Sequence, residues 1–173
     1  DDCSNVYITV RKMKYPMNSF KDLQFLIPKD CDGASPLPYN LVIFFNSISE
    51  SIEAAQYLRG LVLLEARDKI KWFNFEMSPE FCKEKSDRFN EGRNFGLMCT
   101  KSFGMGINLP NITLVIQCRP SCNMCTLWQR FGPGARDPKC EAIALFFVEL
   151  KYFNQMEEEK AVRRRRKRRH CVT

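Results

Sequence analysis

Four short apolar runs, each bounded by polar or turn-forming residues, constrain the fold of this chain more than any other feature. They are "LVIFF" (41–45), "FGLMC" (95–99), "ITLVIQC" (112–118) and "AIALFFVE" (142–149). Continuous apolar runs of this length are typical of strands that are covered on both faces. Segments with apolar residues at helical spacing lie between them. This alternation predicts an α/β fold, with a parallel sheet flanked by helices on both faces.

Weaker patterns complete the expected set of elements. Two further strands are predicted at 6–10 ("VYITV") and 70–75 ("IKWFNF"), and three helices at 51–64, 78–92 and 122–131. The first helix has Ser49 or Ser51 available as its N-cap. The second has Ser78 as N-cap, Pro79 at its first position and Gly92 as its stop.

The chain has the length of one domain with a sizeable core. We expect a lead-in at 1–38, a lobe at 39–150 and a charged, basic tail at 151–173. Open parallel sheets bind ligands at the carboxyl ends of their strands. The candidate functional loops are therefore those after Phe45, after Cys99 and after the helix that ends near Phe131.

The positive charge of the chain is concentrated in its tail. The formal net charge is +7, and the run "RRRRKRR" (163–169) alone carries seven positive charges, so the remainder is formally neutral. Any nucleic acid held by the body must be bound by individually placed groups, with the tail adding a sequence-independent attraction to phosphates. No apolar run reaches the roughly 18 residues that span a bilayer, so we expect no membrane partner. No signal peptide is recognisable either.

The spacing of the cysteines and the position of the single histidine do not favour a metal site. Nine cysteines at irregular spacing favour reduced thiols in an intracellular protein. Zinc is an alternative for Cys118, Cys122, Cys125 and Cys140, but only Cys122 and Cys125 have C-x-x-C spacing and no second pair follows. The single histidine, His170, lies in the basic tail. We predict no bound metal at these residues.

The connection between two of the predicted strands is unusually specific. It reads "KSFGMGINLPN" (101–111). Gly104 and Gly106 permit positive φ or a close approach of the backbone to another group, and Pro110 stiffens the exit. A loop of this composition suits a backbone that passes close to a ligand.

From Thr100 onward the order of motifs, "TKSFGMGINLPNITLVIQ … QRFGPGARD", resembles the second RecA-like lobe of RecQ-like superfamily 2 DNA helicases. "FGMGINLPN" is similar to motif V of that family and "QRFGPGARD" to its motif VI. Upstream, "VIFFNSISESIEAAQYLR" is similar to motif IV and its helix, and "MSPEFCKEKSDRFNEG" to the segment that follows it. The resemblance implies a RecA-like fold of the P-loop NTPase type.

The resemblance also implies a set of functional residues. Contacts to the DNA backbone fall on Ser47, Thr100 and Lys101. Contacts near the nucleotide fall on Gly104, Gly106, Asn108 and Arg136. Arg136 matches the arginine finger and Gln129 the motif VI glutamine, which makes these two the expected catalytic residues. Phe103 would pack beneath the loop, as the phenylalanine of the family does.

The same resemblance implies ATP with Mg²⁺ as cofactor, in a site shared with a first RecA-like lobe supplied in cis or in trans. The expected partner is single-stranded or partly duplex DNA, with no small-molecule substrate other than ATP, and the expected location is the nucleus. The implied activity is that of an ATP-dependent 3′ to 5′ DNA helicase in recombination or repair.

Three residues depart from the family pattern. Pro133 stands where motif VI has its first arginine, Lys101 where an acidic or small residue is usual, and Asn74 where a histidine is common. Proline supplies neither charge nor a hydrogen-bond donor. The sequence also contains no G-x-x-x-x-G-K-[ST] phosphate loop and no D-E-x-H box. The alternative is therefore a non-catalytic nucleic-acid-binding or partner-docking remnant of a helicase.

Overall fold

The structure is a computed structural model that describes residues 5–28, 39–73, 83–84, 87–89, 91, 93–94, 96–100, 112–120, 123–135 and 140–153. At Phe73, Pro133 and Ala135 it describes the backbone alone. Among these residues, the structure contains no helix with the length and apolar character needed to cross a bilayer.

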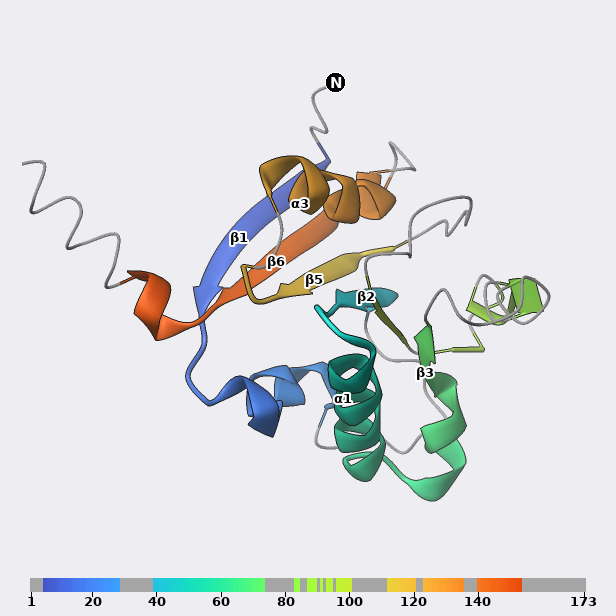
Figure 1. Cartoon of the computed structure of the whole chain (residues 1–173). Coiled ribbons are helices and arrows are strands. Elements are labelled where there is room, and N and C mark those ends of the chain that lie inside the picture. The colour runs from blue at the N-terminus through green and yellow to red at the C-terminus, as the bar shows by residue number, and fades with distance from the viewer. Residues whose placement is uncertain are drawn as a thin grey trace, which may run out of the picture.

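A six-stranded, fully parallel sheet organises the molecule, as predicted (Figure 1). The strands lie in the order β1-β6-β5-β2-β4-β3. They are β1 (Val6–Lys12), β2 (Leu41–Phe44), β3 (Ile70–Phe73), β4 (Gly96–Cys99), β5 (Leu114–Cys118) and β6 (Ala142–Val148). The segment before residue 39 thus adds a strand to the same sheet as the lobe.

The central strands end level with one another. Phe44, the last residue of β2, is paired with Cys99 of β4 on one side and Gln117 of β5 on the other. The Phe45 N–H continues the ladder by donating to the Cys99 carbonyl at 2.8 Å. Phe45 and Thr100, which directly follow β2 and β4, therefore lie at the same carboxyl edge of the sheet.

One face of the sheet is covered by α1 (Ile48–Gly60) together with the short 3-10 helices η1 (Met17–Ser19) and η2 (Lys21–Leu26) (Figure 1). Phe20, between η1 and η2, links these elements, because its ring centroid lies 6.2 Å from that of Phe45 and 6.3 Å from that of Tyr57 on α1. Leu23, Leu26, Ile43, Leu58, Ile116 and Phe147 belong to the same buried cluster.

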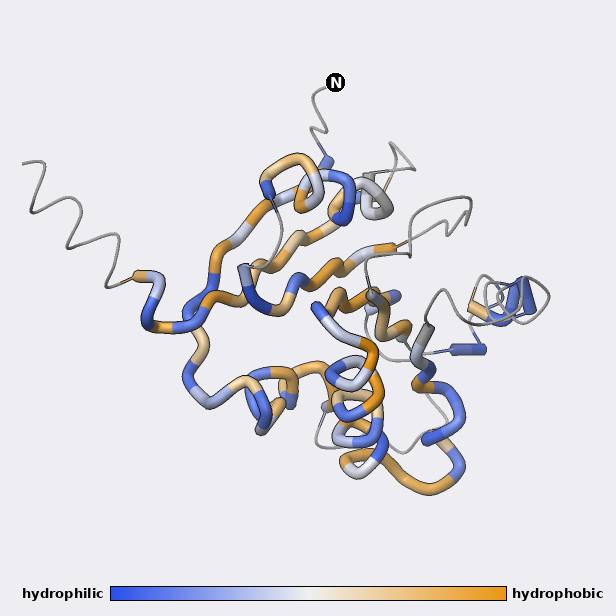
Figure 2. The backbone as a smooth tube through the Cα atoms, viewed as in Figure 1, coloured by the Kyte–Doolittle hydropathy of each residue, from blue (hydrophilic) through white to orange (hydrophobic). Residues whose placement is uncertain are grey.

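The opposite face is covered by α3 (Met124–Phe131) and by the 3-10 helix η4 (Gly132–Ala135) (Figure 1). Leu127 and Phe131 of α3 pack with Val42, Phe44, Phe89, Leu97 and Val115 in a second buried cluster. Figure 2 shows the apolar residues concentrated along the central strands and hydrophilic residues along much of α1 and the 3-10 helix after it. This distribution is the physical reason for a sheet buried between two layers.

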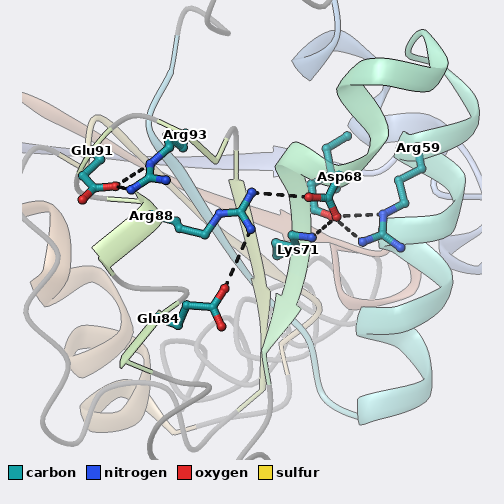
Figure 3. Close-up of polar contacts among 8 residues, drawn as sticks. Arg59, Asp68, Lys71, Glu84, Arg88, Glu91 and Arg93 are labelled. Carbon is teal, nitrogen blue, oxygen red and sulfur yellow. Dashed lines mark hydrogen bonds and ion pairs between the residues drawn. The ribbon is translucent and has the colours of Figure 1, made fainter.

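The edge at β3 is held by charged residues rather than by a continuous apolar face. Two nitrogens of Arg59 donate to the Ile70 carbonyl at 3.0 and 2.7 Å, and the guanidinium lies 4.7 Å from the Trp72 ring centroid. Burial lowers the pKa of Arg59, partly offset by nearby Asp68. Asp68 also pairs with Lys71 and, at 3.4 Å, with Arg88 (Figure 3). These contacts join α1 and the 3-10 helix η3 (Leu64–Lys69) to β3.

Some predicted boundaries were wrong. The helix expected at 51–64 begins at Ile48 and ends at Gly60, and its N-cap is Ser47 rather than Ser49 or Ser51. The sequence "SISE" over 47–50 has the S-x-x-E spacing of a capping box, which explains the earlier start. Of the helix expected at 78–92, the described part is helical at 83–84 and 87–89.

Candidate functional site

Ser47 and Thr100 both lie at the carboxyl edge of the sheet, one after β2 and the other after β4. Ser47 is exposed, whereas Thr100 is only 6% exposed. A phosphate contact from Thr100 must therefore use the small part of that residue that reaches the surface. Of the two, Ser47 is the more accessible to a ligand.

Ser47 forms the N-terminus of α1 together with Glu50. The Ser47 hydroxyl oxygen accepts the Glu50 N–H at 3.2 Å, and the Glu50 carboxylate accepts the Asn46 N–H at 3.2 Å. The cap uses an acceptor site of the Ser47 hydroxyl, so its O–H can still donate to an anion. The N-terminus of a helix also favours negative charge through its dipole and its N–H groups. The arrangement is chemically suited to a phosphate.

Arg119 ties the end of β5 to this helix terminus. Its guanidinium contacts the second Glu50 oxygen at 2.6 Å and lies 3.8 Å from a Glu149 oxygen. Its backbone has a φ of 70°, in the left-handed region that non-glycine residues rarely adopt, and its N–H donates to the Phe147 carbonyl at 3.0 Å. No pattern in the sequence indicated this role for Arg119. Only the S-x-x-E spacing could have singled out Glu50.

A buried pair lies beneath the same edge, on the face covered by α3. Arg130 of α3 donates to the side-chain oxygen of Gln117, and its guanidinium lies 5.4 Å from the Phe44 ring centroid. The Gln117 side chain donates to the carbonyls of Cys118 and Arg119 at 2.9 and 3.0 Å. These bonds connect α3 to the backbone that carries Arg119. No sequence pattern predicted that Gln117 and Arg130 would pair.

The end of the described part of the segment that resembles motif VI, at η4, lies at the amino edge of the sheet. A Cβ placed on Gly134 of η4 would lie 2.8 Å from Ala142, the first residue of β6, and 3.4 Å from Val115, the second residue of β5. We expected the loop after Phe131 at the carboxyl edge, and that expectation was wrong. Because α3 starts after the carboxyl end of β5 and runs back along the sheet, its end reaches the amino edge.

The predicted site residues that the structure describes lie in two separate places. Ser47 and Thr100 share the carboxyl edge, whereas Gln129 is exposed on α3, next to the buried Arg130. The remaining predicted residues, Lys101, Gly104, Gly106, Asn108 and Arg136, lie outside the described part of the chain, as does Phe103. Their roles stay predictions.

The described cysteines differ in their surroundings. Cys99 and Cys118 are buried, and burial raises the pKa of both thiols above the ordinary value. Cys125 is exposed, Cys140 is partly buried and Cys122 lies outside the described residues. Within the part of the chain that the structure describes, no three or more metal-ligating side chains gather at one point.

Comparisons with known proteins agree with this architecture. Residues 34–137 match the family model of the helicase conserved C-terminal domain. A search of curated proteins gave no match.

Solved structures of helicases share the fold. The Escherichia coli DEAD-box protein SrmB, bound to regulator of ribonuclease activity A, is 20% identical over 84% of this chain and 76% of that chain, with a TM-score of 0.60. A DEAD box protein from Methanococcus jannaschii is 16% identical over 92% of this chain and 40% of that chain, with a TM-score of 0.67. Mycobacterium smegmatis helicase Lhr, bound to ssDNA and AMP-PNP, is 19% identical over 83% of this chain and 19% of that chain, with a TM-score of 0.61.

The chain therefore spans well under half of the length of the last two helicases and about three quarters of the first. At these identities the structures show the fold alone. The family match covers more than half of the chain. This chain belongs to the family of helicase conserved C-terminal domains and has the RecA-like fold of those domains.

Proposed function

We propose that this chain is the second lobe of an ATP-dependent 3′ to 5′ DNA helicase of the RecQ-like type, and that it contributes a track for the DNA backbone. The observation that carries the proposal is the level ending of β2 and β4, because Ser47 and Thr100 follow these two strand ends at the same edge of the sheet. Hydroxyls and helix N-termini contact phosphates without reading base identity, as translocation along a strand requires.

DNA is proposed as the substrate because of the motifs. "FGMGINLPN" and "QRFGPGARD" are similar to motifs V and VI of RecQ-like DNA helicases. Lhr, which has a similar fold, was solved with ssDNA bound. The basic run at 163–169 would add a general attraction to phosphates and is also compatible with import into the nucleus, where we place the protein.

The nucleotide would be held jointly with a first lobe, and ATP with Mg²⁺ would supply the phosphoryl group that is hydrolysed. The described residues fit this role only in part. Gln129 is exposed and accessible to a partner lobe, while Pro133 provides no cation. Arg136, four residues after Gly132, would stabilise the charge that develops at the γ-phosphate, with Gly104, Gly106 and Asn108 near the sugar.

The alternative is a non-catalytic nucleic-acid-binding or partner-docking lobe, and Pro133 is the residue that favours it. The two functions share the DNA track and differ in hydrolysis. The track is therefore tested first, by its binding to DNA.

Variants of Ser47 test the track without removing the helix cap. Asn and Asp both cap helices well, so Ser47→Asn and Ser47→Asp should each keep the free energy of unfolding within about 0.5 kcal/mol of the parent. Ser47→Asp places a negative charge beside the proposed phosphate, whereas Ser47→Asn remains neutral and can donate. We expect fluorescence anisotropy to show weaker binding of a single-stranded DNA by the aspartate variant alone.

A labelled RNA of the same sequence serves as the second ligand. Equal binding of DNA by both variants and the parent would contradict the track at Ser47. Tighter binding of RNA than of DNA would contradict the assignment to DNA helicases. Failure of the parent chain to bind either strand at low salt would contradict the proposed function as a whole.

A further inference from the structure

A group of basic and aromatic residues lies at the carboxyl end of the edge strand β1 and on η2, on other strands than Ser47 and Thr100. We call it the basic corner. It consists of Arg11, Lys12, Lys14, Tyr15, Lys21 and Phe25, all of them exposed.

The corner has an unbalanced positive charge. Asp22 is the only acidic residue in the segment from 11 to 28, and its carboxylate accepts the backbone N–H groups of Lys14 at 3.1 Å and Tyr15 at 2.9 Å. It is therefore engaged in fixing the turn after β1. Among the residues described here, no carboxylate forms an ion pair with any of the four cations of the corner. Their charge remains available to an anionic partner.

Two aromatic rings accompany these cations. Tyr15 is 48% and Phe25 43% exposed, so both rings reach the solvent. Lys21 Nζ lies 5.7 Å from the Tyr15 ring centroid, and the Arg11 guanidinium lies 5.6 Å from that of Phe25. Cations beside exposed aromatic rings are the combination that binds single-stranded nucleic acid, with phosphates on the cations and bases stacked on the rings.

The position of the corner relates it to the proposed DNA track. In the order β1-β6-β5-β2-β4, the carboxyl ends of the strands form one row, from Lys14 after β1 to Ser47 after β2 and Thr100 after β4. Neighbouring strands are about 4.8 Å apart, so the ends of β1 and β2 are separated by roughly 14 Å along this edge. One strand of nucleic acid has the length to contact both.

The carboxylates between the two ends are already paired. The Met13 N–H donates to the Val148 carbonyl at 2.9 Å, which brings β1 next to Glu149. Glu149 is 3.2 Å from Lys151 and 3.8 Å from Arg119, and Arg119 also holds Glu50. The acidic groups on the route are therefore neutralised by their own partners.

We propose that the basic corner is a second binding surface for single-stranded nucleic acid, which extends the track beyond Ser47 toward β1. Lys14 and Lys21 contact phosphates, and Tyr15 provides a stacking platform for a base. The proposal rests on the proposed function in that it continues the same track along the same edge of the sheet.

The experiment compares two pairs of charge-removing substitutions in the complete chain. Lys14→Gln/Lys21→Gln alters the corner. The control, Arg67→Gln/Lys83→Gln, also removes two exposed cations, of which Arg67 lies on η3, directly before β3 at the opposite edge of the sheet. Both pairs lower the net charge equally, so a difference between them reports position rather than total charge. Urea unfolding midpoints verify that both variants are folded.

The readout is the affinity for a labelled single-stranded DNA as salt is raised. Losing two phosphate contacts should reduce the salt slope by about 1.4, so between about 50 and 200 mM salt the parent should lose about sevenfold more affinity than the corner variant. Tyr15→Leu should weaken binding about fivefold at fixed salt. The control pair should retain the parental slope.

Each contrary result has a distinct meaning. Corner and control pairs with the same slope overturn the proposal, and if Ser47→Asp still weakens binding, the proposed function stands without it. The proposal is also overturned if polyglutamate displaces the labelled DNA as well as unlabelled DNA does and Tyr15→Leu leaves the affinity unchanged. The surface would then attract any polyanion. A parent chain that binds no strand overturns the proposed function together with the corner.

Discussion

We expect the Arg119→Gly variant to be more stable than the Arg119→Ala variant. At most positions glycine is the more destabilising of these two residues. Both substitutions remove the 2.6 Å contact with Glu50. The side chain of Arg119 is 35% exposed and that of Glu50 is 20% exposed. For a pair so accessible to water, the loss is about 1 kcal/mol in the free energy of unfolding. The two variants differ in the backbone alone. At a φ of 70°, alanine keeps the strain of the left-handed region, whereas glycine does not.

The expected difference between the two variants is about 1 kcal/mol in favour of glycine. With a urea m-value of about 2 kcal/mol/M, the glycine variant should unfold at a midpoint about 0.5 M higher than the alanine variant. Tryptophan fluorescence or circular dichroism would follow the transition. A cycle with Glu50→Gln, which preserves an acceptor for the Asn46 N–H, separates the ion pair from the backbone contribution.

Arg67, on η3, provides the control. It is exposed in a 3-10 helix with no positive φ, so Arg67→Gly should be less stable than Arg67→Ala by about 0.5 kcal/mol or more. If Arg119→Gly were also less stable than Arg119→Ala, the backbone at Arg119 would not be strained in the way that its φ of 70° predicts.

Other consequences concern packing, burial and hydrolysis. Gly96→Ala should lower the free energy of unfolding by about 1–3 kcal/mol, because the new Cβ would lie 2.6 Å from Leu41 Cδ1 on the paired strand. An unchanged midpoint of urea unfolding would contradict this. The raised pKa of the buried Cys118 thiol keeps it protonated in the fold, so stability should fall as pH rises above about 9, where the unfolded thiol ionises. Cys118→Ala should reduce that fall but not abolish it, because the buried Cys99 thiol contributes in the same direction. The chain alone should not hydrolyse ATP, and in a fusion to a related first lobe, at saturating ATP, Pro133→Arg should raise the rate while Arg136→Ala abolishes it. Rates unaffected by both substitutions would favour the non-catalytic alternative.

The sequence by itself determined the type of fold. Runs such as "LVIFF" are too short for helices and too apolar for a half-exposed sheet, so a parallel sheet covered on both faces was the arrangement that could bury them. The motif order predicted a RecA-like second helicase lobe, and the family match confirms it at the level of helicase C-terminal domains. Ser47 and Thr100 could both be placed near strand ends from the sequence. Thr100 directly follows the run at 95–99, and Ser47 is two residues after the run at 41–45.

The tertiary structure alone decided which residues meet. Arg119 and Glu50 are 69 positions apart, and they form an ion pair because β5 and β2 are neighbours whose ends are level. The direction of α3 placed the segment after Phe131 at the amino edge, a result that periodicity cannot provide. The basic corner likewise has no sequence motif, since its charge becomes a surface only when the turn bound by Asp22 folds back onto the edge strand. Strand order and helix direction are set by long-range packing, and local sequence patterns do not encode them.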